Sequence, residues 1–141
     1  MAVWTERLRE RDPRRLTLLA EADGLVGFAN TVFEESRRWG ALLDNLHVAA
    51  AYKRCGIGSQ LICLTAEALA RRADRTGLYL WVLEHNRAAR AFYEARGARL
   101  EGREPVTAPG GVAGRLCGSP VKLRYVWADP SALRPTSVET P

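Results

Sequence analysis

Hydrophobic residues along the first third of the chain gather in short stretches that are separated by polar turns. Three of these stretches have the length and composition of β-strands, at residues 16–22, 25–33 and 41–48. The dipeptide Asp23-Gly24 lies between the first two stretches and is a strong signal for a tight hairpin turn. A polar loop at residues 34–39 leads through Gly40 into the third stretch. The pattern therefore predicts an antiparallel meander of three strands.

The pattern changes to helical spacing after a loop at residues 49–55. Hydrophobic residues then recur at intervals of three or four, at Ile57, Leu61, Leu64 and Ala68. Gly77 is expected to end this helix. Residues 78–83 are largely apolar, which is typical of a central strand that is buried on both faces. A strand, a helix and a second strand in this order predict a parallel crossover.

The remaining predicted elements are short. Asn86 is a preferred residue at the start of a helix, and Gly97 is a preferred residue just beyond the end of one, so a helix is predicted over residues 87–96. A short helix is predicted at residues 4–11, and two strands are predicted at residues 98–101 and 121–127. Between these strands lies a Gly- and Pro-rich loop at residues 107–120, and a loose tail follows at residues 129–141. We expect one domain over residues 1–128 and a flexible tail over residues 129–141.

The composition is that of an ordinary globular domain. Of the 141 residues, 47% are hydrophobic and 26% are charged, and a chain of this length can bury a core without disulfides or metals. Cys55, Cys63 and Cys117 match neither a disulfide framework nor a zinc-ligand spacing, so no metal is expected. The N-terminus is charged and unlike a secretory signal, and no hydrophobic run approaches the roughly 20 residues of a membrane span. These features indicate a soluble, cytoplasmic protein with no membrane partner.

The formal net charge of +5 comes almost entirely from arginine. The densest group of arginines alternates with acidic residues near the N-terminus and consists of Arg7, Arg9, Arg11, Arg14 and Arg15. No aromatic residues are interleaved with this group and no nucleic-acid-binding motif accompanies it. We interpret it as a solvated helix face and expect no nucleic-acid partner.

The segment Gly56-Ile57-Gly58 at the start of the first long helix has the features of a phosphate-binding turn. A helix N-terminus offers free backbone N–H groups and a partial positive charge, and glycine lets a ligand approach the backbone closely. Lys53 and Arg54 add positive charge, and Ser59 adds a hydroxyl. The P-loop pattern is absent, and Leu61 stands where a dinucleotide fingerprint needs a third glycine. On spacing alone, a plain tight turn is an equally good interpretation.

The residues around this turn extend the pattern. Residues 43–60 comprise an apolar strand, a loop with the aromatic Tyr52, and Lys-x-x-Gly-x-Gly at the start of a helix. This segment resembles the acyl-CoA motif of the GNAT superfamily of N-acetyltransferases. Lys53 stands where the family usually has Gln or Arg, which keeps a positive charge, and Ala50 stands where proline is common.

A second motif follows in the order that this family shows. The strand at residues 80–83 leads to Asn86 and then to a helix that carries Tyr93 before Gly97. The resemblance runs over about residues 16–127. It implies an α/β (α+β) fold, with a mixed, mostly antiparallel, twisted sheet flanked by helices.

The resemblance also implies that acetyl-CoA binds in a cleft where two parallel strands splay apart. Backbone groups at Leu46, His47 and Val48 would pair with the pantetheine arm. The segment that would hold the pyrophosphate comprises Lys53, Arg54, Cys55, Gly56, Ile57, Gly58 and Ser59. Asn86 would bond the pantetheine or an ordered water, although its residue type also suits a helix N-cap alone.

The reaction that the family relationship implies is direct attack of an amine on the acetyl thioester in a ternary complex. Tyr93 matches the tyrosine that protonates the thiolate leaving group in many relatives. A phenol and a thiol have pKa values within about two units of each other, so this transfer is chemically reasonable. In isolation, Tyr93 would be read as core packing beside Phe92.

A base is needed to remove a proton from the attacking amine. Asp44 is one candidate, because it shares a face with Leu42 and Leu46 if the strand is regular. Glu34 and Glu35 in the preceding loop are alternatives, as is a relay through water. The side chain of His47 should point the other way and is expected to be structural.

The N-terminus departs from the family pattern. Relatives begin with a strand and a helix or two before the strand at residues 16–22, whereas here only residues 1–12 are available. We expect the first strand to be missing and the edge of the strand at 16–22 to be exposed, which invites pairing in a homodimer. The leading hypothesis is an N-acetyltransferase that acts on a primary amine of a small molecule, a protein or a peptide. The alternative is a regulatory or degenerate CoA-binding domain without turnover.

Overall fold

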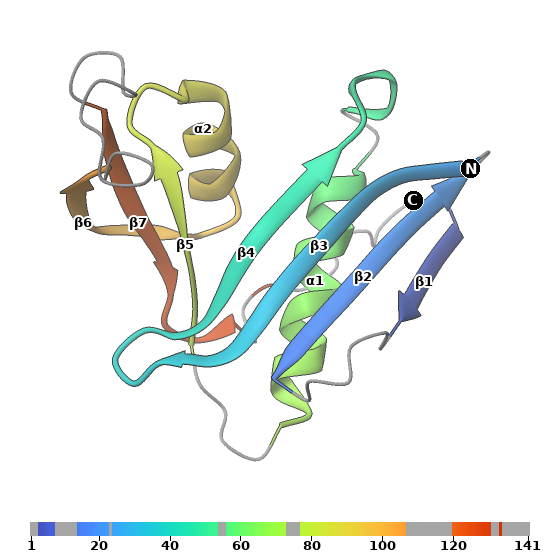
Figure 1. The fold of residues 1–141 in the computed structure, drawn as a ribbon, viewed down its shortest axis with the longest axis horizontal. Coiled ribbons are helices and arrows are strands. Elements are labelled where there is room, and N and C mark those ends of the chain that lie inside the picture. Colours follow the sequence, from blue (N-terminus) through green and yellow to red (C-terminus); the bar gives the residue numbers. More distant parts are fainter. Residues whose placement is uncertain are drawn as a thin grey trace.

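The computed structural model describes residues 3–7, 14–22, 24–53, 56–72, 77–106, 120–130 and 133, with the backbone alone for residues 3–7 and 22. These residues form one sheet with the strand order β1-β2-β3-β4-β5-β7-β6 (Figure 1). The strands are β1 Val3–Arg7, β2 Arg15–Ala22, β3 Gly24–Ser36, β4 Gly40–Val48, β5 Leu78–Leu83, β6 Arg99–Pro105 and β7 Val121–Trp127. The helices are α1 Ile57–Ala70 and α2 Arg87–Ala95, preceded by a short 3-10 turn, η1 Ala50–Tyr52.

The predicted meander of β2, β3 and β4 is confirmed, since both neighbouring pairs are antiparallel. Gly24 begins β3 with a positive φ of 101°, as a tight hairpin requires; Asp23 lies outside the described residues. The polar loop predicted at 34–39 is wrong over its first half, because β3 continues to Ser36, which pairs with Gly40. The hydroxyl of Ser36 accepts hydrogen bonds from the backbone N–H groups of Arg38 (3.2 Å) and Trp39 (3.0 Å) and so stabilises a shorter turn.

The strand β1 corrects two expectations. Where the sequence pattern predicts a helix at residues 4–11, the structure has a strand at Val3–Arg7 that pairs antiparallel with β2, Trp4 opposite Ala20. The unpaired backbone groups at the edge of β2 are partners for an extended segment, whereas a helix this short is marginal by itself. The first strand is therefore present, and it covers the edge of β2 that was expected to be exposed. Residues 8–13 lie outside the described residues.

The crossover from β4 through α1 to β5 is parallel, as predicted. The two strands pair at only two positions, Ala41 opposite Leu78 and Leu42 opposite Tyr79, and then diverge (Figure 1). Gly40 allows the close approach where they meet. Its φ is 97°, and a Cβ atom there would lie 2.1 Å from the carbonyl oxygen of residue 77.

The helix α1 lies across the face of the sheet formed by β2, β3 and β4 (Figure 1). Its hydrophobic positions meet that face, and the residues that it buries are Ile57, Leu61, Ile62, Cys63, Thr65, Ala66 and Leu69. Cys63 is buried, as expected for a small apolar residue in this helix. None of the helices among the described residues is long and apolar enough to cross a membrane.

The second half of the sheet also follows the predicted order. β5 is a central strand between β4 and β7, and β7 spans the predicted residues 121–127. β6 is longer than the predicted 98–101 and forms the edge of the sheet. Residues 107–119 and most of the predicted tail lie outside the described residues.

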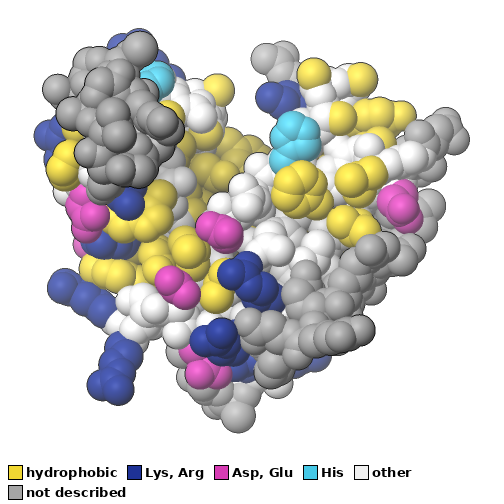
Figure 2. Space-filling view, viewed as in Figure 1, with side chains coloured by type: hydrophobic (Ala, Val, Ile, Leu, Met, Phe, Trp, Pro, Cys, Tyr) yellow, Lys and Arg dark blue, Asp and Glu magenta, His cyan; other side chains and the backbone are white. Residues whose placement is uncertain are grey.

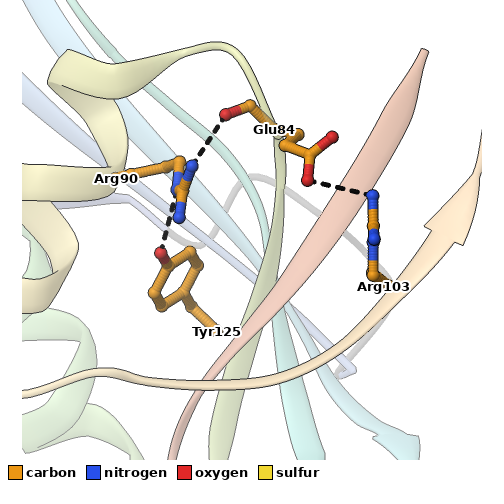
Figure 3. A network of polar contacts seen from close by, with 4 residues as sticks. All are labelled: Glu84, Arg90, Arg103 and Tyr125. Atoms are coloured by element: carbon orange, nitrogen blue, oxygen red, sulfur yellow. Dashed lines mark hydrogen bonds and ion pairs between the residues drawn. The ribbon is translucent and has the colours of Figure 1, made fainter.

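A polar network holds α2 against β5 and β7 (Figure 3). The hydroxyl of the fully buried Tyr125 accepts a hydrogen bond from Nε of Arg90 (3.2 Å) and donates one to Glu94, one helical turn further along α2. Arg90 also donates to the carbonyl oxygen of Glu84 at 3.0 Å, and Arg103 forms an ion pair of 3.0 Å with the Glu84 carboxylate. These bonds tie the helix to the residue that follows β5 and to the interior of β7, and so help to determine where its side chains lie.

Candidate functional site

The divergence of β4 and β5 opens a cleft of about 1020 Å³. Its walls come from residues 43–48 of β4, residues 80–83 of β5, the first turn of α1 and one side of α2. Figure 2 shows the molecule hollowed between the half that carries β1 to β4 and the half that carries β5 and α2. Beyond Leu42 and Tyr79 no register pair joins the described residues of the two strands. Backbone N–H and C=O groups along both walls are therefore available to a ligand.

The β4 wall of the cleft contains a β-bulge. Asn30 and Thr31 of β3 are neighbours in sequence, but their partners in β4 are Asn45 and Leu43. Asp44 is therefore the extra residue of a bulge, which bends and twists a strand locally. The side chain of Asp44 is exposed and lines the cleft.

The bulge changes which side chains of β4 share a face. Leu43 and Leu46 pair opposite residues of one and the same face of β3, so both point to that side of the sheet. Leu42 therefore points to the opposite face from Leu46. The expectation that Asp44 shares a face with both is wrong, because it assumed a regular strand.

The first turn of α1 has no capping side chain and no acidic residue. Gly56 stands at the N-cap with a positive φ of 80°, so a residue with a Cβ atom would be strained there. Gly58 faces α2, where a Cβ atom would lie 3.2 Å from Cζ of Phe92. The first turn of α1 thus lines the cleft together with Lys53, and no side chain of the described residues caps its N–H groups.

The helix α2 brings Asn86 and Tyr93 into the same cleft. The side chain of Asn86 accepts a hydrogen bond from the backbone N–H of Ala89 at 3.2 Å, so it does serve as an N-cap. The ring of Tyr93 packs edge-on against Phe92 and Trp127, with ring centroids 5.3 and 6.2 Å away. Burial raises the pKa of Tyr93 above its ordinary value, so the phenol keeps its proton at neutral pH.

The structure gathers the described site residues that the sequence predicts into this one cleft. They are Asp44, Leu46, His47, Val48, Lys53, Gly56, Ile57, Gly58, Ser59, Asn86 and Tyr93; Arg54 and Cys55 lie outside the described residues. The side chain of His47 was expected to be structural, but it is exposed and lies against the ring of Phe28, with centroids 5.7 Å apart.

The alternative bases lie outside the cleft. Neither Glu34 nor Glu35 lines it. Glu34 instead forms an ion pair of 2.5 Å with Arg72, beyond the C-terminal end of α1. Asp44 is the carboxylate-bearing residue of the cleft among the described residues.

Sequence reasoning missed several residues of the cleft wall, among them Asn45, Tyr52, Trp81, Phe92 and Arg96. Tyr52 and Trp81 belong to segments that were assigned to the site, so their neighbours could have indicated them. No signal in the sequence indicated Arg96, because its place in the cleft depends on how α2 packs against α1.

Comparison with known proteins agrees with this geometry. The sequence model of the acetyltransferase (GNAT) family matches residues 1–98. The chain belongs to this family, and the predicted family and fold are confirmed. No curated protein matches the chain significantly.

Solved structures share the fold at low sequence identity. One is a putative streptothricin acetyltransferase from Bacillus anthracis in complex with acetyl coenzyme A, at 20% identity and a TM-score of 0.69 over 84% of this chain and 64% of that one. A nourseothricin acetyltransferase is 25% identical, with a TM-score of 0.68 over 82% and 65% of the two chains. NAA60 of Arabidopsis thaliana in complex with a bisubstrate analogue is 21% identical, with a TM-score of 0.65 over 81% and 75%. The chain thus spans just under two thirds of the length of the two antibiotic-named acetyltransferases.

Proposed function

We propose that this protein transfers the acetyl group of acetyl-CoA to a primary amine by direct attack in a ternary complex. One observation carries the proposal. The uncapped N-terminus of α1, the side chain of Asn86 and the phenol of Tyr93 line a single cleft at the point where two parallel strands diverge. Family membership and solved relatives with bound acetyl-CoA support the same assignment.

The cleft fits CoA in shape and in charge. Its length of unpaired strand backbone suits the amide groups of a pantetheine arm, which need both donors and acceptors. The free N–H groups of α1 with Lys53 beside them suit a pyrophosphate, because a helix N-terminus favours anions. When bound, acetyl-CoA supplies an activated thioester, and these residues orient it.

Tyr93 has the properties required of the general acid. Its phenol lines the cleft, is kept protonated by burial, and makes no hydrogen bond to another described residue. It is therefore free to donate its proton to the sulfur as the thiolate leaves. Asp44 is the residue that we assign to accept the proton of the amine, directly or through a water, from the opposite wall.

The acceptor is a primary amine of a small molecule, a protein or a peptide. This range is supported by the solved relatives, which include a putative streptothricin acetyltransferase, a nourseothricin acetyltransferase and NAA60. We expect the enzyme to act in the cytoplasm, without a metal and without nucleic acid.

Binding and turnover are tested separately. Acetyl-CoA at 100 times its dissociation constant should stabilise the protein by about 2.7 kcal/mol, a rise in melting temperature of roughly 8 °C for a domain of this size. Turnover is then measured as thiol release from acetyl-CoA with a panel of amines. Absence of any thermal shift would refute CoA binding. A shift without thiol release would refute turnover and support the regulatory alternative.

Tyr93→Phe tests the proton donor. We expect kcat to fall about 100-fold, the lower end of the usual range for a lost general acid, with CoA affinity unchanged. Tyr79→Phe is the matched control, because Tyr79 is a buried tyrosine of β5 whose pKa is also raised by burial but which does not line the cleft. Equal rates for Tyr93→Phe and wild type would remove Tyr93 from this role.

A further inference from the structure

Arg96, the residue that follows α2, carries a cationic group without an ion-pair partner in the described part of the chain. Its side chain lines the cleft, and its Nε atom is buried with no hydrogen-bond partner. No carboxylate of the described residues forms an ion pair with it. A shielded guanidinium N–H without an acceptor is unfavourable, because it loses its bonds to water and gains none in return.

The backbone and the side chain of Arg96 are both held in place. Its N–H donates to the carbonyl oxygen of Tyr93 at 3.0 Å, and its carbonyl oxygen accepts from Nε1 of Trp127 at 3.1 Å. The guanidinium carbon lies 4.7 Å from the centroid of the Phe92 ring, a cation–π contact. The group is therefore preorganised, although no atom of the described residues accepts a hydrogen bond from its Nε.

The surroundings of Arg96 place its charge between α1 and α2. Phe92, on which it stacks, is the side chain that faces Gly58 in the first turn of α1. Cys63 lies further along α1, and the charge of Arg96 also acts on its thiol. Burial and the negative charge of Glu67 raise the pKa of this thiol, and the positive charge of Arg96 partly opposes the rise. The guanidinium thus lies on the α2 wall of the cleft, against the ring that faces the first turn of α1.

We propose that Arg96 binds a phosphate group of CoA from the α2 wall of the cleft. A planar guanidinium that can offer two parallel N–H groups matches phosphate oxygens, and such charge-assisted bonds are stronger than neutral ones. This inference rests on the proposed function, since it assumes that CoA occupies the cleft. It adds a side chain to a cradle that otherwise consists of backbone N–H groups with Lys53 beside them.

CoA carries phosphate at two places, the pyrophosphate and the 3′-position of the ribose. Both offer the same chemistry to a guanidinium, so the choice between them is an outcome of the experiment. Three probes are compared. CoA carries both kinds of phosphate, 3′-dephospho-CoA carries the pyrophosphate alone, and pantetheine carries no phosphate.

The affinity of each probe is measured by calorimetry for the wild type, Arg96→Met and Arg96→Lys. Met keeps the apolar contact with Phe92 without the charge, and Lys keeps the charge without the planar fork. Arg99→Met is the matched control, because Arg99 is an exposed arginine of β6 that does not line the cleft. Melting temperatures without ligand show whether each variant remains folded.

We expect Arg96→Met to weaken CoA binding about tenfold to a hundredfold, with a smaller loss for Arg96→Lys and none for Arg99→Met. The affinity for pantetheine should not change. A loss that disappears with 3′-dephospho-CoA assigns Arg96 to the ribose phosphate, and a loss that persists with it assigns Arg96 to the pyrophosphate.

Two results would overturn the proposal. One is unchanged CoA affinity in a folded Arg96→Met, and the other is an equal loss for all three probes, which would indicate a structural role alone. Failure of the wild type to bind CoA would instead refute the proposed function itself.

Discussion

The helix cap that Asn86 forms and its proposed role as a ligand of CoA predict different responses to substitution. Its side chain accepts a hydrogen bond from the N–H of Ala89 at 3.2 Å, and the first turn of α2 holds no acidic residue that could take its place. Asn86→Ala removes this acceptor, and a lost N-cap of this kind costs about 1 kcal/mol. For a domain of this size, that corresponds to a fall in melting temperature of about 3 °C.

Asn86→Asp and Asn86→Ser separate the two roles. Both keep a side-chain oxygen that can cap the helix, and the charge of Asp also favours a helix N-terminus, so both should melt within about 1 °C of the wild type. Neither side chain has the amide N–H₂ group that we expect to donate to the pantetheine or to an ordered water. A lost hydrogen bond of about 0.5–1.5 kcal/mol lowers CoA affinity roughly twofold to tenfold.

The assays are thermal unfolding followed by circular dichroism without ligand and calorimetry with CoA. Arg87→Ala is the control, because Arg87 is the exposed next residue, with no place in the cleft. If Asn86→Ala melted with the wild type, the cap would contribute nothing. If Asn86→Asp and Asn86→Ser both bound CoA with wild-type affinity, Asn86 would be a cap alone.

Two further predictions concern the stability of the fold. Gly40→Ala should destabilise the protein by about 3 kcal/mol in urea unfolding, because it combines a positive φ with a Cβ atom 2.1 Å from the carbonyl oxygen of residue 77. Gly24→Ala, where φ is 101° and the space around the residue is open, should cost only about 1 kcal/mol. Equal losses of unfolding free energy for the two variants would contradict this reasoning. Burial raises the pKa of Tyr93, so its contribution to stability is complete below the unfolded pKa of about 10 and is lost as pH rises through the folded value. Tyr93→Phe should therefore show a flatter fall in unfolding free energy above pH 10 than the wild type, and identical slopes would refute the assignment.

Local sequence patterns predict most of the elements because most of them depend on local preferences. The hairpin of β2 and β3, the start of α1 at Gly56 and the cap of α2 at Asn86 each follow from a few adjacent residues. The helix predicted at residues 4–11 is wrong for the same reason. The strand β1 forms because the edge of β2 offers unpaired backbone groups to it. The sequence of residues 3–7 gives no information about that edge, which belongs to a different segment of the chain.

The residues of the candidate site also differ in whether local sequence alone could identify them. Gly56 and Asn86 could be identified from sequence, because each meets a local backbone requirement as well as a chemical one. The assignment of Asp44 to a face failed, because a bulge is a property of the pairing of two strands and a single strand does not reveal it.

By itself, then, the sequence determined the order of the elements from residue 16 onward, the family, and the glycine turn that we propose as the phosphate site. Tertiary structure alone decided that β4 and β5 part after two pairs, that Asp44 stands in a bulge, and that Arg96 lines the cleft. These features arise where segments distant in the chain meet, and periodicity and turn residues carry information only about their own neighbourhood.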